Sequence, residues 1–205
     1  MKPEKLEALA NEGNLDANFE LAKKYAYGSL GYERNPELTV KLYKKGAQAG
    51  HPDSMLYYGT LYKTGNLNTK KNYRTAVKWM EKSAQAGNTD AMMALSELYL
   101  DKKAGVKDET KAFQWTKKAA DSNHILALNP LANMYHKGIG TTKDYYQAAK
   151  WYYVWQSMFS EHTEPMQRIT DALWDIHQQI GTPAMEQAKA EAEDYYANNE
   201  MNFGN

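Results

Sequence analysis

The sequence repeats itself with a period of 36 or 37 residues. Three sets of positions recur at this period, and their agreement indicates a real internal repeat. They are a tyrosine column (Tyr25, Tyr62, Tyr99, Tyr135), a column of small residues (Ala17, Ser54, Ala91, Ala127) and a tryptophan column (Trp79, Trp115, Trp151). The chain is therefore expected to contain four tandem units of one structural type.

Each unit has the pattern of two helices joined by a glycine-containing loop. In the second unit, small and apolar side chains recur at i, i+4, i+7 and i+8 from Ser54, which is one face of a helix. A residue able to cap the first turn precedes each second helix, at Asn35, Asn72, Asp108 and Asp144. Two antiparallel helices cannot bury both apolar faces alone, so the units are expected to stack as an all-α solenoid of four helix-turn-helix repeats.

The fourth unit carries the motif of a known family. It reads Leu131-Ala132, Tyr135, Gly138-Ile139-Gly140, Asp144-Tyr145, Ala148 and Trp151-Tyr152. In these residues the chain resembles the bacterial type of the Sel-one-like repeat family, a relative of the tetratricopeptide repeats. The resemblance implies a right-handed α-solenoid that acts as a protein-interaction adaptor, and it implies no single partner.

The two ends of the chain lie outside the repeats. A short N-terminal helix is expected first, within residues 1–157, followed by repeats at about 13–50, 51–87, 88–123 and 124–157. Residues 158–205 are expected to form C-terminal capping helices, the last of which begins with Thr182 as its cap and Pro183 as its first residue. Pro130 is expected to kink or shorten the first helix of the fourth repeat.

The composition argues against several classes of function. Twenty-five basic residues balance 25 acidic ones, so no overall positive charge favours nucleic acid or an anionic membrane as a partner. No apolar run reaches the length of a membrane span. Acidic residues stand near the N-terminus where a signal peptide would be apolar, so the chain as written is expected to be cytoplasmic, or periplasmic if a leader was removed. A monomer is expected.

The sequence also lacks the motifs of catalysis. There is no cysteine, and the five histidines (His51, His124, His136, His162, His177) form no metal-binding pair, so surface or capping roles are expected for them. Gly138-Ile139-Gly140 is interpreted as a turn between helices, not as a phosphate-binding loop. The aromatic columns are interpreted as core, and Trp115→Ala is expected to cost about 3–5 kcal/mol. No metal, cofactor or enzymatic activity is therefore expected.

The positions that face a partner follow from the resemblance. In tetratricopeptide-like solenoids the first helices line the concave surface, and carrying that arrangement over by register gives fourteen partner-binding candidates. They are Phe19, Lys23, Tyr27, Asp53, Leu56, Thr60, Lys63, Asp90, Met93, Glu97, Leu100, Asn129, Asn133 and His136. The apolar ones among them suit a peptide or helix ligand, unless they only pack between neighbouring first helices.

Three functions remain open from the sequence. The first is an adaptor that binds a protein or peptide in the concave face. The second is a bacterial immunity or inhibitor protein that occludes a toxin or effector enzyme, and the third is cell-wall processing or binding. A basic stretch from Lys41 to Lys82, with nine bases and two acids, is either a solvated face or a docking site for an acidic partner.

Overall fold

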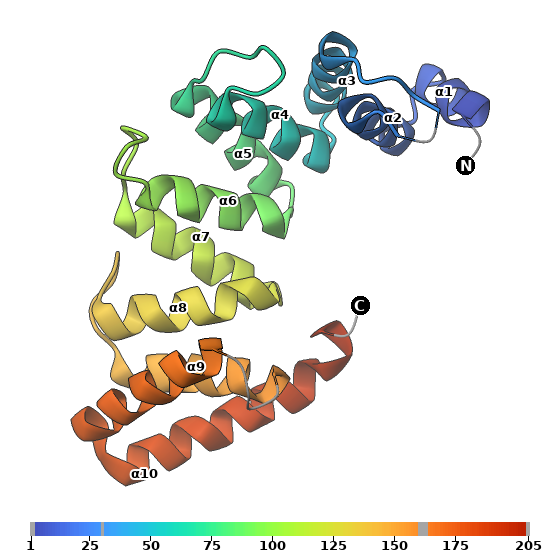
Figure 1. The fold of residues 1–205 in the computed structure, drawn as a ribbon. Coiled ribbons are helices and arrows are strands. Elements are labelled where there is room, and N and C mark those ends of the chain that lie inside the picture. The colour runs from blue at the N-terminus through green and yellow to red at the C-terminus, as the bar shows by residue number, and fades with distance from the viewer. Residues whose placement is uncertain (1–2, 30, 160–163, 204–205) are drawn as a thin grey trace. The chain divides into compact units, whose positions relative to one another are not determined.

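A computed structural model describes residues 3–29, 31–159 and 164–203 of the chain (Figure 1). In these ranges the regular structure is entirely helical, with ten helices and no strand. The helices divide into two compact units, residues 1–106 and 107–205. The expected all-α repeat fold is confirmed.

The first unit contains α1 to α6. Each helix packs against the next one along the chain, from α1 on α2 to α5 on α6. The bounds are α1 Pro3–Asn11, α2 Leu15–Tyr27, α3 Pro36–Gln48, α4 Pro52–Thr64, α5 Tyr73–Gln85 and α6 Thr89–Leu100. This connectivity matches helix pairs that bury their apolar faces against neighbours in sequence.

The second unit contains α7 Glu109–Asp121, α8 Ile125–Lys137, α9 Tyr145–Met158 and α10 Glu164–Phe203. Here α7 packs on α8, α8 on α9, and α9 on α10. Gly181 has φ 74° and ψ 171°, which interrupts α10 and divides it into an N-terminal segment, 164–180, and a C-terminal segment, 182–203. The Thr182 hydroxyl oxygen lies 3.0 Å from Nε2 of His177 on the preceding segment.

Side-chain caps begin the second helix of every repeat, as the sequence predicts. The side-chain oxygens of Asn35, Asn72, Asp108 and Asp144 accept hydrogen bonds from backbone N–H groups three residues on, at 2.9–3.0 Å. Each bond satisfies a first-turn donor that the helix itself leaves free, and a cap of this kind contributes about 1 kcal/mol. The repeat pattern thus sets where these four helices start.

His51 caps the first helix of the second repeat. Its Nδ1 accepts a hydrogen bond from the backbone N–H of Ser54 at 3.2 Å. Because Nδ1 accepts, the ring proton belongs on Nε2, which then donates to the Asp16 carboxylate 3.0 Å away. This buried histidine links α2 to α4, which accords with a capping role and leaves it no lone pair for a metal.

Small residues allow the helices to approach closely. A Cβ placed on Gly59 would lie 3.2 Å from the Ala76 carbonyl oxygen and 3.1 Å from Cγ of Met80. The same column holds Ala22, Ser96 and Ala132, all buried. Glycine inside a helix costs about 1 kcal/mol relative to alanine, and here that cost permits the contact between α4 and α5.

Pro130 does not shorten α8. The helix runs without interruption through Ile125–Lys137, thirteen residues, the same length as α2, α3, α4, α5 and α7. Of the expected kink or shortening, the shortening is therefore wrong, although proline supplies no N–H to the carbonyl four residues earlier.

The C-terminal segment of α10 packs against α9 through two hydrogen bonds to one carboxylate and through a contact between two aromatic rings. Glu191 accepts a hydrogen bond from the Tyr146 hydroxyl at 2.6 Å and another from the Lys150 ammonium at 3.0 Å. The Tyr195 ring packs edge-on against Trp151, with ring centroids 5.2 Å apart. These contacts hold the segment in place on the last repeat.

Acid is expected to weaken this attachment. The pKa of Glu191 is held below its ordinary value, first by the hydrogen bond from Tyr146 and then by that from Lys150. The same bond raises the pKa of Tyr146 to about 12. Since the folded carboxyl binds its proton less readily than the unfolded one, the contact stabilises the fold above the unfolded pKa of about 4.3, and that contribution is lost as the pH falls through the lower folded value.

Urea unfolding between roughly pH 6 and pH 3 measures this loss of stability. Other carboxyls titrate in the same range, so a control must isolate the contribution of Glu191. The control is Glu191→Gln, which keeps the size of the side chain and removes the charge. The gap in stability between wild type and variant should shrink as the pH falls. A gap that stays constant would show that Glu191 does not stabilise the fold through its charge.

Candidate functional site

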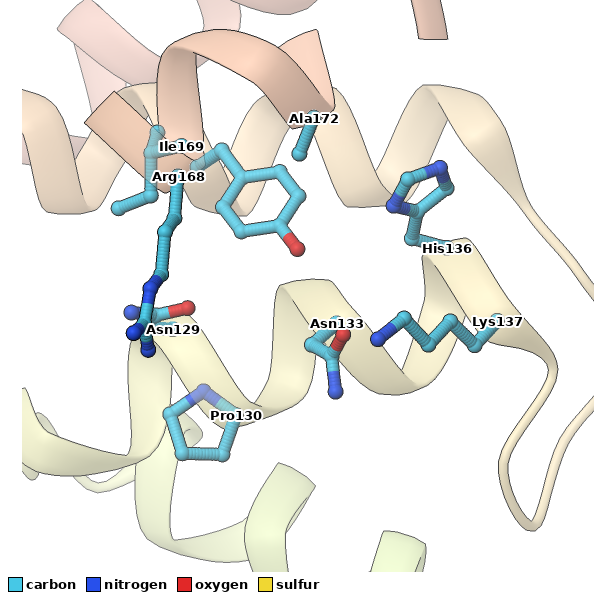
Figure 2. A pocket seen from close by; sticks show the side chains of 9 residues that line it. Asn129, Pro130, Asn133, His136, Lys137, Arg168, Ile169 and Ala172 are labelled. Carbon is cyan, nitrogen blue, oxygen red and sulfur yellow. The ribbon is translucent and has the colours of Figure 1, made fainter. Parts of the chain in front are cut away.

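The second unit contains a cleft of about 660 Å³ between α8 and the N-terminal segment of α10 (Figure 2). Residues from three helices line it: Asn129, Pro130, Asn133, His136 and Lys137 from α8, Tyr152 from α9, and Arg168, Ile169 and Ala172 from α10. A volume of this size is within the range of ligand and peptide pockets.

The α8 wall carries polar side chains in one line. Asn129, Asn133 and Lys137 are spaced by four residues, so they lie above one another on one face of the helix. Both asparagines are half-buried and Lys137 is exposed. Figure 2 shows Lys137 extending along α8 toward Asn133. No hydrogen bond or ion pair within the described part of the chain occupies these three side chains.

The α10 wall of the cleft is the N-terminal segment of α10, which packs on the protein through its apolar face. Met166, Ile169, Leu173 and Ile176 are buried, as expected of an amphipathic helix with one face on the protein. Arg168 lies next to this face and is exposed, and Figure 2 shows it reaching toward Asn129. Arg168 also has no described hydrogen-bond or ion-pair partner.

Two lining groups, His136 and Tyr152, are constrained by their surroundings. Nε2 of His136 lies 2.8 Å from the Asp175 carboxylate, so this ring already has a partner on α10. Burial raises the pKa of Tyr152 to about 12, so its hydroxyl keeps its proton at neutral pH and can donate a hydrogen bond.

The first unit contains another cleft, of about 570 Å³. Three tyrosines line this cleft. Tyr27 is 72% exposed, whereas Tyr43 is buried, and the ring centroids of Tyr43 and Tyr57 lie 5.5 Å apart. Arg34 and Thr60 also line this cleft, together with Ala26, Leu61, Thr64, Asn66 and Leu67. Leu67, at the rim of this cleft, has a φ of 52°, a conformation that L-residues rarely adopt.

The structure brings together some of the candidates named from the sequence. Asn129, Asn133 and His136 line the cleft of the second unit, and Tyr27 and Thr60 line that of the first. Five of the fourteen candidates therefore contribute to a cleft.

Two apolar candidates belong to the core. Phe19 is 9% exposed and its ring packs against Tyr43, His51 and Tyr57, with centroids 5.2 to 5.9 Å apart. Leu56 is also 9% exposed. These two side chains are therefore covered within the fold, as the alternative of packing between helices predicts.

Other candidates join helices or stay on the surface. Lys63 pairs with Glu97 at 3.2 Å, which links the second repeat to the third. Asp53 accepts a hydrogen bond from the Asn88 side chain at 2.6 Å, and Lys23 pairs with Glu20. On α6, Asp90 and Leu100 are exposed and Met93 is half-buried, and none of them lines either cleft.

The structure adds residues to the clefts that the repeat did not indicate. Arg168 and Ile169 come from outside the repeats, where no column exists, and Arg34 comes from a loop. Tyr43 and Tyr57 belong to none of the residue columns named from the sequence.

Among the described residues, no group of three or more histidines, cysteines or acidic side chains is placed to hold a metal ion. His162, one of the histidines considered from the sequence, lies outside the described residues. Across the same ranges, none of the helices combines the length and the apolar content that crossing a membrane requires.

Comparisons with known proteins agree with the repeat architecture. A comparison with curated protein sequences gives no match. Among solved structures, a Sel1 repeat protein from Oxalobacter formigenes is 24% identical over 87% of this chain and 74% of its own, with a TM-score of 0.70. The protective antigen c5321 from uropathogenic Escherichia coli, which has an SLR fold, is 23% identical over 94% of this chain and 47% of its own, with a TM-score of 0.49.

A third solved structure, the immunity protein Pa5087 from Pseudomonas aeruginosa, is 19% identical over 92% of this chain and 74% of its own, with a TM-score of 0.51. At these identities the likenesses describe the fold alone. The family model named Sel1 repeat matches residues 15–51, 52–88, 89–124 and 125–153, which together make up more than half of the chain. The resemblance found in the sequence is thus confirmed, and the chain belongs to the Sel1 repeat family.

Proposed function

We propose that this chain is a protein-interaction module that holds a protein or peptide on the first-helix side of its repeats. Sel1 repeat proteins generally mediate protein–protein interactions and are typically non-catalytic scaffolds. The principal contact is the cleft of the second unit, and the module acts without a cofactor, as a monomer, and on protein instead of nucleic acid.

One observation carries this proposal. Asn129 and Asn133 stand one turn apart, half-buried in a cleft, and no described group of the chain satisfies their amides. Polar groups that are partly removed from water are usually hydrogen-bonded in a folded protein. Two amides in line without a partner in the described chain favour a ligand with alternating donors and acceptors, which is the chemistry of a peptide backbone.

Site-specific photo-crosslinking tests the proposal. A benzophenone amino acid placed at position 133 is expected to capture one partner protein from the lysate of the source cells. The matched control carries the same group at Gln114, which is exposed on α7 and lines neither cleft. Capture from position 133 alone supports the cleft as the contact. Equal capture from both positions, or capture from 114 alone, would place the interaction elsewhere.

The alternative function, which also depends on binding a protein, is that of an immunity or inhibitor protein. A solved structure with a similar fold is described as an immunity protein, Pa5087, and this likeness is the observation that favours the alternative. An immunity protein binds one enzyme tightly and abolishes its activity, whereas an adaptor leaves its partners active. The activity of the captured partner, measured free and in a one-to-one mixture with this chain, separates the two.

A further inference from the structure

The cleft of the second unit has a one-sided charge. Lys137 and Arg168 contribute two cations from opposite walls of the cleft. No aspartate or glutamate is among its lining residues, so the lining carries no negative charge to balance them. On the α10 wall, Asp175 is engaged with His136 at 2.8 Å and Asp171 accepts a hydrogen bond from Gln167 at 2.9 Å. Cations that no described carboxylate pairs with favour an anionic occupant.

The neutral donors of the cleft point to the same occupant. The Asn129 and Asn133 amides each offer two N–H donors, and the Tyr152 hydroxyl stays protonated because burial raises its pKa to about 12. The Arg168 guanidinium and the Lys137 ammonium can each donate charge-assisted hydrogen bonds to a carboxylate, and such bonds are stronger than those between neutral groups. Figure 2 shows Arg168 and Lys137 extending from the two walls toward the asparagines.

The spacing of these groups fits a short extended chain. Eight residues of helix separate Asn129 from Lys137, which is about 12 Å at the rise of an α-helix. An extended peptide advances about 3.3 Å per residue, so roughly four residues span that distance. Pro130, Ile169 and Ala172 add apolar surface to the same cleft, which suits the aliphatic parts of peptide side chains.

We propose that this cleft binds an acidic peptide segment, with Lys137 and Arg168 on its carboxylates and the two asparagine amides on its backbone. The proposal rests on the proposed function and names the chemistry of the partner at the same site. A peptide is favoured over a nucleic acid because each asparagine offers an acceptor as well as donors: the backbone of a peptide supplies N–H groups for that acceptor, whereas the phosphodiester backbone of a nucleic acid has no donor.

Fluorescence anisotropy with the full chain tests the proposal. The probe is a labelled hexaglutamate peptide with blocked ends, compared with a hexaglutamine peptide and with a single-stranded oligothymidine of equal charge. Hexaglutamate is expected to bind more tightly than both other probes. Lys137→Ala/Arg168→Ala is expected to weaken it by about tenfold or more, the usual consequence of losing charge-assisted bonds. Asn129→Ala/Asn133→Ala is expected to weaken it as well.

The matched control removes two cations outside the cleft. Arg74 and Lys78 are exposed on α5 in the first unit, within the basic stretch noted from the sequence. Arg74→Ala/Lys78→Ala is expected to leave the affinity for hexaglutamate nearly unchanged. Circular dichroism melts establish that each variant is folded before binding is compared.

Several results would overturn the inference. Loss of binding in Arg74→Ala/Lys78→Ala but not in the cleft variant would move the acidic ligand to α5. Tighter binding of oligothymidine would identify a nucleic-acid site, and hexaglutamine binding as well as hexaglutamate would remove the role of charge. If hexaglutamate fails to bind while position 133 still crosslinks a partner, the acidic chemistry is wrong and the proposed function stands. If position 133 captures nothing while hexaglutamate binds, the proposed function fails separately.

Discussion

Gly140→Ala is expected to lower the free energy of unfolding by about 3–5 kcal/mol. Gly140 stands in the loop between α8 and α9 with a φ of 70°. A Cβ there would meet the backbone carbonyl of Glu109 on α7 far inside van der Waals contact, as well as Cβ of Phe113. The left-handed backbone costs an alanine about 1–2 kcal/mol, and a clash with backbone adds more because a carbonyl cannot rotate away like a side chain.

Gly138→Ala separates the two causes. Gly138 has the same φ of 70°, but its added Cβ would meet Cγ of Lys143 at 3.1 Å, the middle of a flexible side chain. Its loss is expected to be about 1–2 kcal/mol, from the backbone conformation alone. Urea unfolding of both variants measures the difference. Losses of equal size would mean that the loop does not lie against Glu109 and that only the backbone conformation matters.

The helices were predictable because their signals are local. Asn35 and its three counterparts each act on a backbone N–H three residues away, so the chain segment alone determines the cap. The same holds for the stops of the second helices: Gly50, Gly87 and Asn123 have positive φ, as their residue types and positions suggest. A repeat multiplies such signals fourfold, which is why the fold class followed from the sequence.

The burial of the candidate partner-binding residues was only partly predictable, because register gives the direction of a side chain and not its burial. Phe19 occupies a first-helix position that corresponds to Leu56 and Met93 in the following repeats. In the first repeat, however, Tyr43 from α3 and Tyr57 from α4 enclose its ring. The depth of such a position depends on the size of side chains on other helices, and the column pattern carries no information about them.

The cleft of the second unit depends on a segment without a repeat. Arg168 and Ile169 belong to α10, whose amphipathic pattern predicts a helix that packs on the protein but not the helix against which it packs. The contact of His136 with Asp175 joins residues 39 positions apart in the sequence. Only the three-dimensional structure brings such groups into one site.

Trp151→Ala is expected to lower the free energy of unfolding by about 3–5 kcal/mol, whereas Trp115→Ala is expected to cost about 1–3 kcal/mol. The two residues share the tryptophan column, and the sequence alone places both in the core. In the structure Trp151 is 7% exposed and packs edge-on against Tyr195. Trp115 is only half-buried, and the Lys118 ammonium lies over its ring at 5.3 Å.

The difference follows from what each deletion leaves behind. Removing Trp151 empties a site between α9 and the C-terminal segment of α10, and surrounding residues collapse only in part around such a cavity. Removing Trp115 mostly opens a surface that water can fill, so the transfer term is smaller and the cavity term nearly absent. Urea unfolding of both variants measures the two losses on one scale. Equal losses would mean that Trp115 is as deeply packed as Trp151, and that the column alone determines burial.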